Sequence, residues 1–523
     1  MVLDIPILSI MLLTPAMGAV LVYFTGRNEE TARTTALAIS FIPLVLSVVL
    51  LLGFFPVTGV ELRSFSPVGS PFTYRAYESA PWLPMYGVTP SGDAAVSYSL
   101  GVDELSAPLV LLTCILTTLA LIINWDEHHR VREFYAMFLF METTILGVFI
   151  SLDFFLFFLF WELGLVPMYF IIAVWGGPRK RYAALKFFLF TFAASIPVLI
   201  GIFAFFAYGG TFNMVRLIEL ARTGALIPAG TVQNLLFVAL LAGFGTKLPT
   251  WPLHTWLPDA HVEAPTGGSV ILAGVLLKLG GYALIRVNVQ MLPQGAHEMY
   301  WVAAILGTIS ILYGAIVCLA QDDLKRLVAF SSVSHMGFVT LGIAAGVVAS
   351  GTPATATGGL LGMSGAIFQM FAHGIVSAAL FMVAGSLGHK AGTRNISEFG
   401  GIAAVTPRLS TFLMIAFLAS LGLPGLVGFV AELSVFLGVY AAFGLLVLIP
   451  LLTVVFTAAY YIWAMQRAIF GPLNARWKDL EDAHSYETVP LAVLCALFAI
   501  FGILPFLLLD MTIQWAARAL GVA

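Results

Sequence analysis

Long apolar runs recur along the whole chain and constrain its fold more than any other feature. Each run is about 20 residues or longer, which is the length that an α-helix needs to cross roughly 30 Å of hydrocarbon. Only 10% of the 523 residues are charged, against roughly 25% in a soluble domain. Because a helix satisfies its own backbone hydrogen bonds, the runs predict an all-α polytopic membrane protein.

About fourteen segments are predicted to span the membrane. The first apolar run begins at Ile5 without a preceding Lys or Arg, so it is expected to be a retained span rather than a secretory signal. The spans are expected at about 5–25, 34–55, 105–124, 133–150, 153–175, 185–209, 233–257, 266–290, 300–320, 325–348, 357–388, 409–440, 443–470 and 488–510.

The spans divide the chain into four parts. Residues 1–132 hold the first three spans and a long exterior loop, 56–104, that is rich in Pro, Gly and Ser. Residues 133–290 hold spans 4–8, and residues 300–470 hold spans 9–13. Residues 471–523 hold a loop and the last span. No separate soluble domain is expected, and the near-zero net charge of −3 argues against nucleic-acid binding.

The uneven distribution of Lys and Arg predicts the orientation. Of the 24 basic residues, 16 fall in loops after odd-numbered spans, and 6 fall in loops after even-numbered spans or near the C-terminus. Since basic loops remain in the cytoplasm, both termini are expected on the outer side. The expected location is the inner membrane of a bacterial or archaeal cell, with a thylakoid or organelle membrane as the alternative. The remaining two basic residues, Lys247 and Lys278, fall inside spans.

Five charged residues lie inside the predicted spans. A charge at the centre of a spanning helix costs about 2.5–3.5 kcal/mol on insertion scales, so the five together would cost on the order of 10 kcal/mol if unpaired. Such residues normally face protein or water and mark proton or ion paths, although any single Glu could instead be the structural partner of a Lys. The candidate proton-translocation residues are Glu142, Glu162, Lys247, Lys278 and Glu432.

Two histidines lie at a similar depth to these charges. Glu162 lies nine residues into its span, roughly 14 Å along the helix axis, and Lys278, His335 and His373 also fall near the predicted midplane. We therefore predict a polar path parallel to the membrane, with half-channels to each face. A pair of haem ligands and two hydrogen-bonded core histidines are the alternatives for His335 and His373.

The other potential ligands are less informative. His254 and His261 lie at or just beyond the end of a span, where a structural role is equally plausible. Cys114, Cys318 and Cys495 are each alone in an apolar run, whereas metal, cluster and disulfide sites need grouped cysteines. No dinucleotide fingerprint or P-loop occurs, so no cofactor or metal is expected in this chain, nor catalysis by the chain alone.

Two spans carry proline-rich interruptions. The seventh contains GTKLPTWPLHTWLPDAH (245–261), and the twelfth contains SLGLPGLVGFVAE (420–432). Proline removes a backbone donor and clashes with the preceding turn, so both helices are expected to be broken. Because spans seven and twelve cross in opposite directions, we predict an inverted repeat of spans 4–8 and 9–13, each with one discontinuous helix. Two unrelated proline kinks are the alternative.

Six stretches of the sequence resemble the antiporter-like subunits of respiratory complex I, and most closely the M-type, or chain 4, subunits of NADH–quinone oxidoreductase. The resemblance covers nearly the whole chain. The stretches are WELGLVPMYFIIAVWGG (161–177), TKLPTWPLHTWLPDAHVEAPTGGSV (246–270), ILAGVLLKLGGYALIR (271–286), KRLVAFSSVSHMGF (325–338), FQMFAHGIVSAALF (368–381) and SLGLPGLVGF (420–429).

The resemblance implies roles for the buried polar residues. Glu162 would pair with Lys247 of the seventh helix, and Lys278 would be the central lysine of the eighth. His335 and His373 would be the histidines of the central axis. We expect protons to pass through this chain of Glu, Lys and His to the terminal acid of the second broken helix.

That terminal acid is Glu432, where the L- and N-type subunits and the Mrp antiporters carry lysine. The resemblance implies that the chain is a non-redox subunit of a proton-translocating complex, beside L- and N-type subunits and membrane lipid. NADH or another donor, flavin, iron–sulfur clusters and quinone would be bound by partner subunits. The alternatives are an Mrp-type cation/proton antiporter subunit, a passive membrane anchor, or the equivalent subunit of a ferredoxin-, reduced F420- or formate-driven complex.

Overall fold

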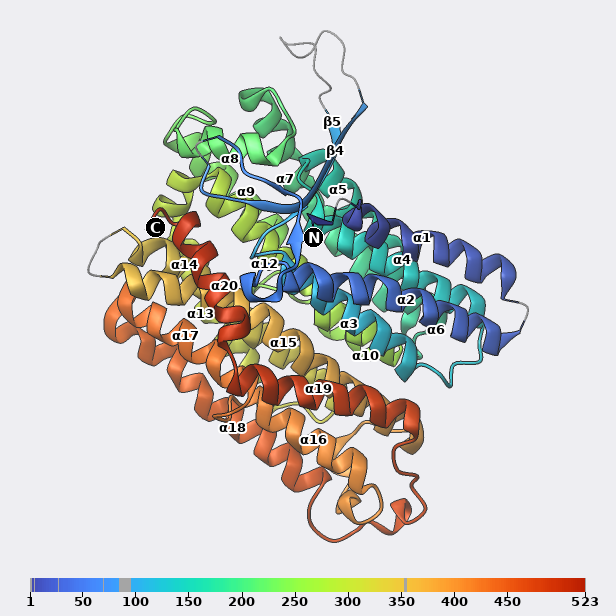
Figure 1. Cartoon of the computed structure of the whole chain (residues 1–523). Coiled ribbons are helices and arrows are strands. Elements are labelled where there is room, and N and C mark those ends of the chain that lie inside the picture. The colour runs from blue at the N-terminus through green and yellow to red at the C-terminus, as the bar shows by residue number, and fades with distance from the viewer. Residues whose placement is uncertain are drawn as a thin grey trace.

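The computed structural model describes residues 2–3, 5–26, 28–68, 70–83, 96–351 and 355–522 (Figure 1). Two parts of the predicted exterior loop, residue 69 and residues 84–95, lie outside the described residues. Arg27, one of the basic residues used to predict the orientation, also lies outside them.

Helices dominate the first half of the described chain. The eighth predicted span is one continuous helical segment, and it includes two π-helical stretches, η2 and η3, on either side of α12. The helices are α1 (Ile7–Thr25), α2 (Glu29–Leu52), α3 (Ala107–Ile123), α4 (Val131–Ile150), α5 (Phe154–Leu163), α6 (Leu165–Trp175), α7 (Lys180–Gly209), α8 (Met214–Arg222), α9 (Thr231–Lys247), α10 (Trp256–Glu263), α11 (Thr266–Ile271), η2 (Leu272–Leu276), α12 (Leu277–Ala283) and η3 (Leu284–Val289).

The second half continues with long helices and ends with a short one. These helices are α13 (Pro293–Leu319), α14 (Leu324–Ala349), α15 (Ala356–Ala391), α16 (Pro407–Ser420), α17 (Val427–Phe443), α18 (Leu448–Ala468), α19 (Ser485–Ile503) and α20 (Phe506–Ala519). Short 3-10 turns connect several elements, and they are η1 (Pro56–Thr58), η4 (Ile396–Glu398), η5 (Ile402–Ala404), η6 (Gly444–Val447) and η7 (Ala475–Trp477).

Eleven helical segments of the described chain are long and apolar enough to cross a membrane. One of these segments, Val427–Ala468, contains both α17 and α18, and the apolar helices α3 and α16 are shorter. The predicted helical membrane architecture is therefore confirmed. The count of fourteen spans, the inverted repeat and the four-part division remain predictions.

Both proline-rich stretches interrupt the helix in which they lie. α9 ends at Lys247 and α10 begins at Trp256. α16 ends at Ser420 and α17 begins at Val427, and the residues between them include Gly422, with a φ of 81°. A φ in this range favours glycine because it has no Cβ. Within the breaks, turn-type backbone hydrogen bonds, such as that from Leu253 N–H to the Thr250 carbonyl at 2.8 Å, replace part of the helical pattern.

The interior of the bundle is formed by three segments whose apolar windows are completely buried, namely Thr266–Val289, Leu324–Ala349 and Ala356–Ala391. α14 packs against α13, α15 and α17, and α15 also packs against α16, α19 and α20. Figure 1 shows the C-terminal helices in red running across the yellow α15. These segments therefore form a core that is shielded from lipid by the outer helices.

Short strands occur at one end of the bundle. β1 (Val2–Leu3) pairs in parallel with β2 (Glu61–Leu62), and β3 (Ser64–Phe65), β4 (Tyr74–Leu83) and β5 (Val96–Val102) form an antiparallel sheet in that order. Glu78 of β4 accepts a hydrogen bond from the backbone N–H of Leu8 at 2.8 Å. The sheet is thereby joined to the first turn of α1, where backbone N–H groups lack helical partners.

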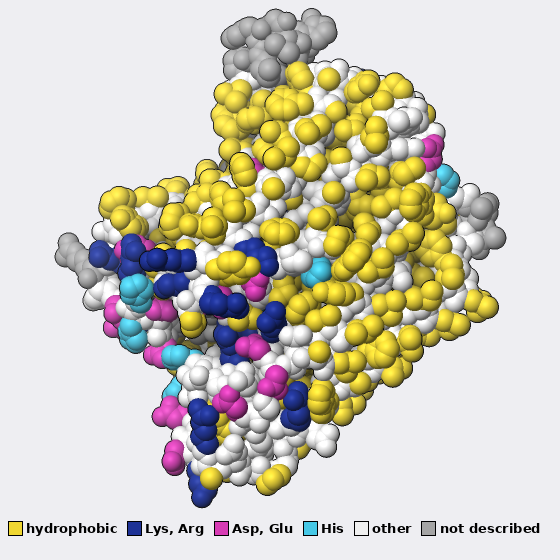
Figure 2. Space-filling model, turned by 180° about the vertical axis from the view of Figure 1, so that it is seen from behind, with side chains coloured by type: hydrophobic (Ala, Val, Ile, Leu, Met, Phe, Trp, Pro, Cys, Tyr) yellow, Lys and Arg dark blue, Asp and Glu magenta, His cyan; other side chains and the backbone are white. Residues whose placement is uncertain are grey.

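Charged side chains gather on one end of the molecule. Figure 2 shows Lys, Arg, Asp and Glu together on one side, whereas hydrophobic side chains cover most of the rest of the visible face. An apolar belt of this kind is expected where helices contact hydrocarbon chains.

Candidate functional site

The buried polar path begins at Lys278, in the middle of the eighth span. Its side chain is completely buried in α12, between the two π-helical stretches. The Lys278 ammonium donates to the carbonyl oxygen of Ala273 and lies 2.7 Å from His373 Nδ1. The structure therefore brings together two of the predicted site residues, from α12 and α15.

The path continues from His373 to the neighbouring helices. The rings of His373 and His335 have centroids 5.6 Å apart, and His335 Nε2 lies 3.5 Å from the hydroxyl of Ser420. Ser420 Oγ in turn forms a 2.7 Å hydrogen bond with the hydroxyl of Tyr461. Side chains from α12, α15, α14, α16 and α18 thus form a polar row inside an apolar core, although no hydrogen bond among the described residues joins the two imidazole rings.

Ser420 and Tyr461 were not among the residues predicted from the sequence. Ser420 is the last residue of α16, directly before the second helix break, and Tyr461 is completely buried in α18. A serine at a break carries no distinctive signal, because turns commonly contain serine. A buried tyrosine hydroxyl usually has a partner, but the sequence does not show which partner.

Lys247 and Glu162 do not form the direct ion pair that the family resemblance implies. Among the described residues, no contact within 4.0 Å joins their charged atoms. Lys247 Nζ instead donates to the carbonyl oxygen of Trp161 at 2.9 Å and lies 3.6 Å from the centre of the Trp161 ring. The aromatic face attracts the ammonium, so Trp161 takes the place of the carboxylate.

Glu162 remains close enough to Lys247 for the two charges to interact. Its Oε1 atom is buried and has no hydrogen-bond partner. The indole nitrogen of Trp161 donates to Ser195 at 3.2 Å, which fixes the ring that separates the two groups. Since a buried polar atom normally has a partner, the unpaired carboxylate oxygen indicates a site where a proton or water can bind.

The remaining predicted acids lie on other helices. Glu142 of α4 is completely buried beside the thiol of Cys114, and neither of its carboxyl oxygens has a nitrogen or oxygen hydrogen-bond partner among the described residues. Glu432 of α17 is also buried, and its Oε2 faces Gly422, where an added Cβ would lie 3.1 Å away. No hydrogen bond among the described residues connects Glu432 with either histidine of the path.

A buried ion pair marks the other end of the eighth span. Arg286 of η3 donates to Asp103 Oδ1 at 2.7 Å, and both side chains are at most 1% exposed. Trp515 of α20 donates to Asp103 Oδ2 at 2.8 Å. Arg286 lies within the predicted eighth span, 266–290, although it was among the six basic residues assigned to loops after even-numbered spans; Asp103 compensates its charge inside the protein.

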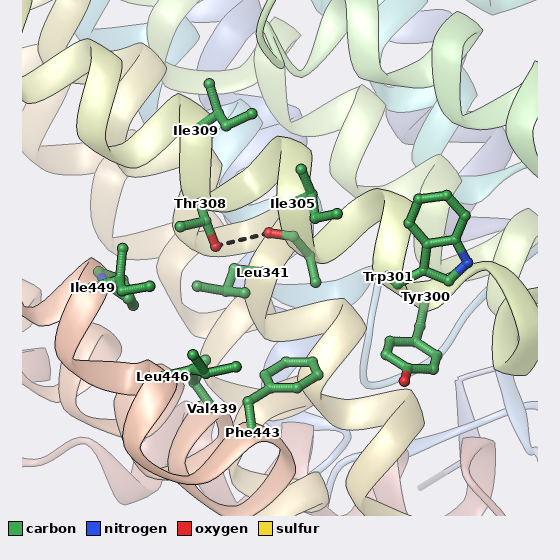
Figure 3. A pocket seen from close by; sticks show the side chains of 12 residues that line it. Tyr300, Trp301, Ile305, Thr308, Ile309, Leu341, Val439, Phe443, Leu446 and Ile449 are labelled. Atoms are coloured by element: carbon green, nitrogen blue, oxygen red, sulfur yellow. Dashed lines mark hydrogen bonds between the residues drawn. The ribbon is translucent and has the colours of Figure 1, made fainter.

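An apolar groove elsewhere in the bundle is lined by none of the residues of the polar path. Figure 3 shows side chains from α13, α14, α17, η6 and α18 around a space of about 390 Å³. The hydroxyl of Thr308 donates to the carbonyl oxygen of Ala304 at 2.8 Å, so it has no remaining need of an acceptor. This groove offers hydrocarbon contacts rather than proton-binding groups.

Comparison with known proteins decides the family. The family described as "NADH:quinone oxidoreductase/Mrp antiporter, TM" matches residues 151–457. The chain belongs to this family. The matched region contains Glu162, Lys247, Lys278, His335, His373 and Glu432, as well as Ser420, whereas Glu142 and Tyr461 lie outside it.

Two relatives match this family member over almost its full length. It is 40% identical to F(420)H(2) dehydrogenase subunit M of Methanosarcina mazei, with 99% of each chain covered. It is 37% identical to NADH-quinone oxidoreductase subunit M of Rhodobacter capsulatus, over 97% of this chain and 94% of the relative. The predicted resemblance to the M-type subunits is therefore confirmed.

A solved structure supports the same assignment. The fold matches a chain of respiratory complex I from Thermus thermophilus with a TM-score of 0.82 and 26% identity, over 98% of this chain and 99% of that chain. The protein is thus a membrane subunit of the type found in multi-subunit complexes.

Proposed function

We propose that this chain is the M-type proton-translocating subunit of a redox-driven quinone oxidoreductase complex. The observation that supports this function best is the buried row from Lys278 through His373, His335 and Ser420 to Tyr461. Groups that can exchange protons rarely lie in the middle of a membrane protein unless they mark an ion path. Their distribution over five helices supports a path that runs parallel to the membrane.

The geometry supports a relay of protons between neighbouring groups. His373 Nδ1 accepts a hydrogen bond from the Lys278 ammonium, which is the contact needed to pass a proton from lysine to imidazole. The gap between the two imidazole rings is wide enough to need one bridging water, and histidine exchanges protons readily near neutral pH. In this proposal Glu432 is the acid from which protons leave.

Lys247 regulates this relay in our proposal. Its ammonium is held by the Trp161 carbonyl and ring, and a rotation of its long side chain would bring it to Glu162. A buried lysine keeps its proton more readily beside a carboxylate than without one. Lys247 would therefore hold its proton when it lies beside Glu162, and it would release the proton toward Lys278 when it lies beside Trp161.

The relatives suggest the setting in which the chain works. The names of the two relatives point to reduced F420 and NADH as candidate electron donors, and the donor is expected to react on other subunits together with flavin, iron–sulfur clusters and quinone. L- and N-type subunits are the expected membrane neighbours. The basic loops are expected to face the cytoplasm, with both termini outside.

Replacement of the central lysine tests this function. In the assembled complex, Lys278→Met should lower the number of protons translocated per electron at least fivefold, because the relay loses its middle group. Pumping is measured by fluorescence quenching in inverted vesicles, and donor:quinone activity is measured with an uncoupler. Lys478→Met, in an exposed loop, is the control. An unchanged proton ratio in the Lys278 variant would rule out this function.

A further inference from the structure

A polar cavity of about 500 Å³ opens on the face that carries the basic loops. It is formed where four connections meet, namely those between α6 and α7, α10 and α11, α13 and α14, and α15 and η4. All four follow odd-numbered predicted spans, and Figure 2 shows charged side chains gathered at this end. Its lining includes Glu263, Asp323, Lys325, His389 and Arg394.

Lys325 and Glu263 are both buried in the wall of this cavity, and among its described lining residues Lys325 is the buried cation. Its side chain lies in the first turn of α14 and is 4% exposed. Its ammonium donates to the carbonyl oxygen of Ala264 at 2.8 Å, and no carboxylate of the described residues lies within 4.0 Å. Since an ammonium has three donors, the others are available to water in the cavity.

The acids around Lys325 are bound to other cations. Asp323 forms a 3.1 Å ion pair with Arg394, and Glu263 lies 3.6 Å from Arg179. The Lys325 ammonium interacts electrostatically with the charges of Arg394, Asp323 and Glu263. Lys325 is thus a cation without a close carboxylate partner, and it lies between the cavity and the protein interior.

His261 connects Lys325 with the central path. Its side chain is completely buried in α10 and stacks on Phe381 with ring centroids 4.3 Å apart. Neither ring nitrogen has a hydrogen-bond partner among the described residues, so both can bind water. α10, which carries His261, packs against α14, which carries Lys325, and Phe381 lies on α15, the helix of His373.

We propose that Lys325 is the residue that takes up protons from this cavity for the relay. The Lys325 amine accepts a proton from cavity water, and the ammonium later gives the same proton through water and His261 to the Lys278 amine. One proton enters and one proton leaves at each step. This inference rests on the proposed function and extends it to the step in which protons enter the protein from the cavity.

Variants at position 325 separate proton transfer from a structural role. Lys325→Arg keeps a cation and a donor for the Ala264 carbonyl, but arginine does not release its proton in proteins. We expect this variant to assemble normally, as measured by native gel electrophoresis, and to translocate at least fivefold fewer protons per electron. Arg326→Met is the matched control, because Arg326 is the exposed neighbour in the same helical turn. It should change the proton ratio less than twofold.

A second variant supplies a pH signature. Lys325→His restores a titratable group whose ordinary pKa is about 6.5. Proton translocation should therefore recover at acidic pH, and it should fall with rising pH at a lower pH than in the unaltered protein, because an imidazole loses its proton more readily than an amine. A merely structural lysine would not give this profile.

The outcomes distinguish this inference from the proposed function. Normal pumping by Lys325→Arg together with loss of pumping in Lys278→Met would overturn the role of Lys325 and leave the proposed function intact. Normal pumping by both variants would overturn the function itself. Loss of pumping in Lys325→Arg, with partial recovery in Lys325→His at acidic pH, is the result that supports uptake through Lys325.

Discussion

Asp103 shows how a charged residue is kept inside this protein. Its carboxylate accepts hydrogen bonds from Arg286 and Trp515, and it interacts with Ser106 at the start of α3. Burial opposes ionisation of Asp103, but the guanidinium of Arg286 outweighs it and holds the pKa of Asp103 below its usual range. The carboxylate therefore remains charged at neutral pH.

Removal of this charge should destabilise the subunit. Asp103→Asn leaves the Arg286 guanidinium buried without an anion, and a broken buried ion pair costs about 3–5 kcal/mol. Thermal unfolding of the detergent-solubilised complex should start at a lower temperature. The matched control is Glu133→Gln, because the 3.3 Å pair of Glu133 with Arg130 is far more exposed, and such surface pairs contribute about 0–1 kcal/mol. Equal destabilisation by both variants would contradict this account.

At the scale of single residues, the sequence predicted some buried charges and missed others. Lys278 and His373 were predicted to lie at one depth, because each lies far inside a long apolar run. Lys325 and Arg286 lie near the ends of such runs, where a side chain can reach either solvent or the interior. For Lys325, the packing of α10 against α14 decides between these alternatives. For Arg286, the position of Asp103 decides.

The break between α16 and α17 brings several site residues together. Ser420 precedes the break, and Gly422 within it faces the carboxylate of Glu432. The prolines and glycines of SLGLPGLVGF predicted that the helix would be interrupted. They could not predict that Ser420 would contact His335, because this contact depends on how α14 and α16 pack.

A substitution at this break tests whether its geometry matters to Glu432. In Gly422→Ala the new Cβ would lie 3.1 Å from Glu432 Oε2 at a φ of 81°. Displacement of the carboxylate should lower proton translocation several-fold. Gly425→Ala is the control, because Gly425 has a similar φ of 93° but nothing lies within 4 Å of its added Cβ. Proton ratios that fall equally in both variants would show that backbone strain alone is responsible.

The π-helical stretches of the eighth span were not predicted. LAGVL contains only residues that are common in an ordinary spanning helix, and LIRVNV adds Arg286 and Asn288, which do not by themselves indicate a π-helix. Such stretches are rare and frequently occur at functional sites. Here η2 provides the carbonyl of Ala273 to the Lys278 ammonium, a contact that hydrophobic periodicity does not reveal.

At the scale of the whole molecule, apolar runs predicted the architecture because the bilayer limits the choice to helices and closed barrels. The position of the polar path followed from the cost of placing charges in hydrocarbon. Direct contacts, such as that of Lys247 with Trp161, depend on the packing of several helices. They could not be obtained from one sequence.

Labelling of introduced cysteines tests the predicted orientation. The three native cysteines are first replaced by alanine. Lys478→Cys lies in an exposed loop after predicted span 13, and Val68→Cys is fully exposed in the loop before β4. In intact cells a membrane-impermeant maleimide should label Val68→Cys, and in inverted vesicles it should label Lys478→Cys. The reverse pattern would place the basic loops outside.

The hydrogen bond between Trp515 and Asp103 joins residues 412 positions apart in the sequence. Ribosomes add about 5–20 residues per second, so the nascent chain waits roughly 20–80 s after Asp103 is made before Trp515 exists. During that interval the carboxylate lacks one of its final partners. α20 therefore completes this part of the interior late in synthesis, and messages truncated before it would leave Asp103 without Trp515, a defect that quality-control proteases can recognise.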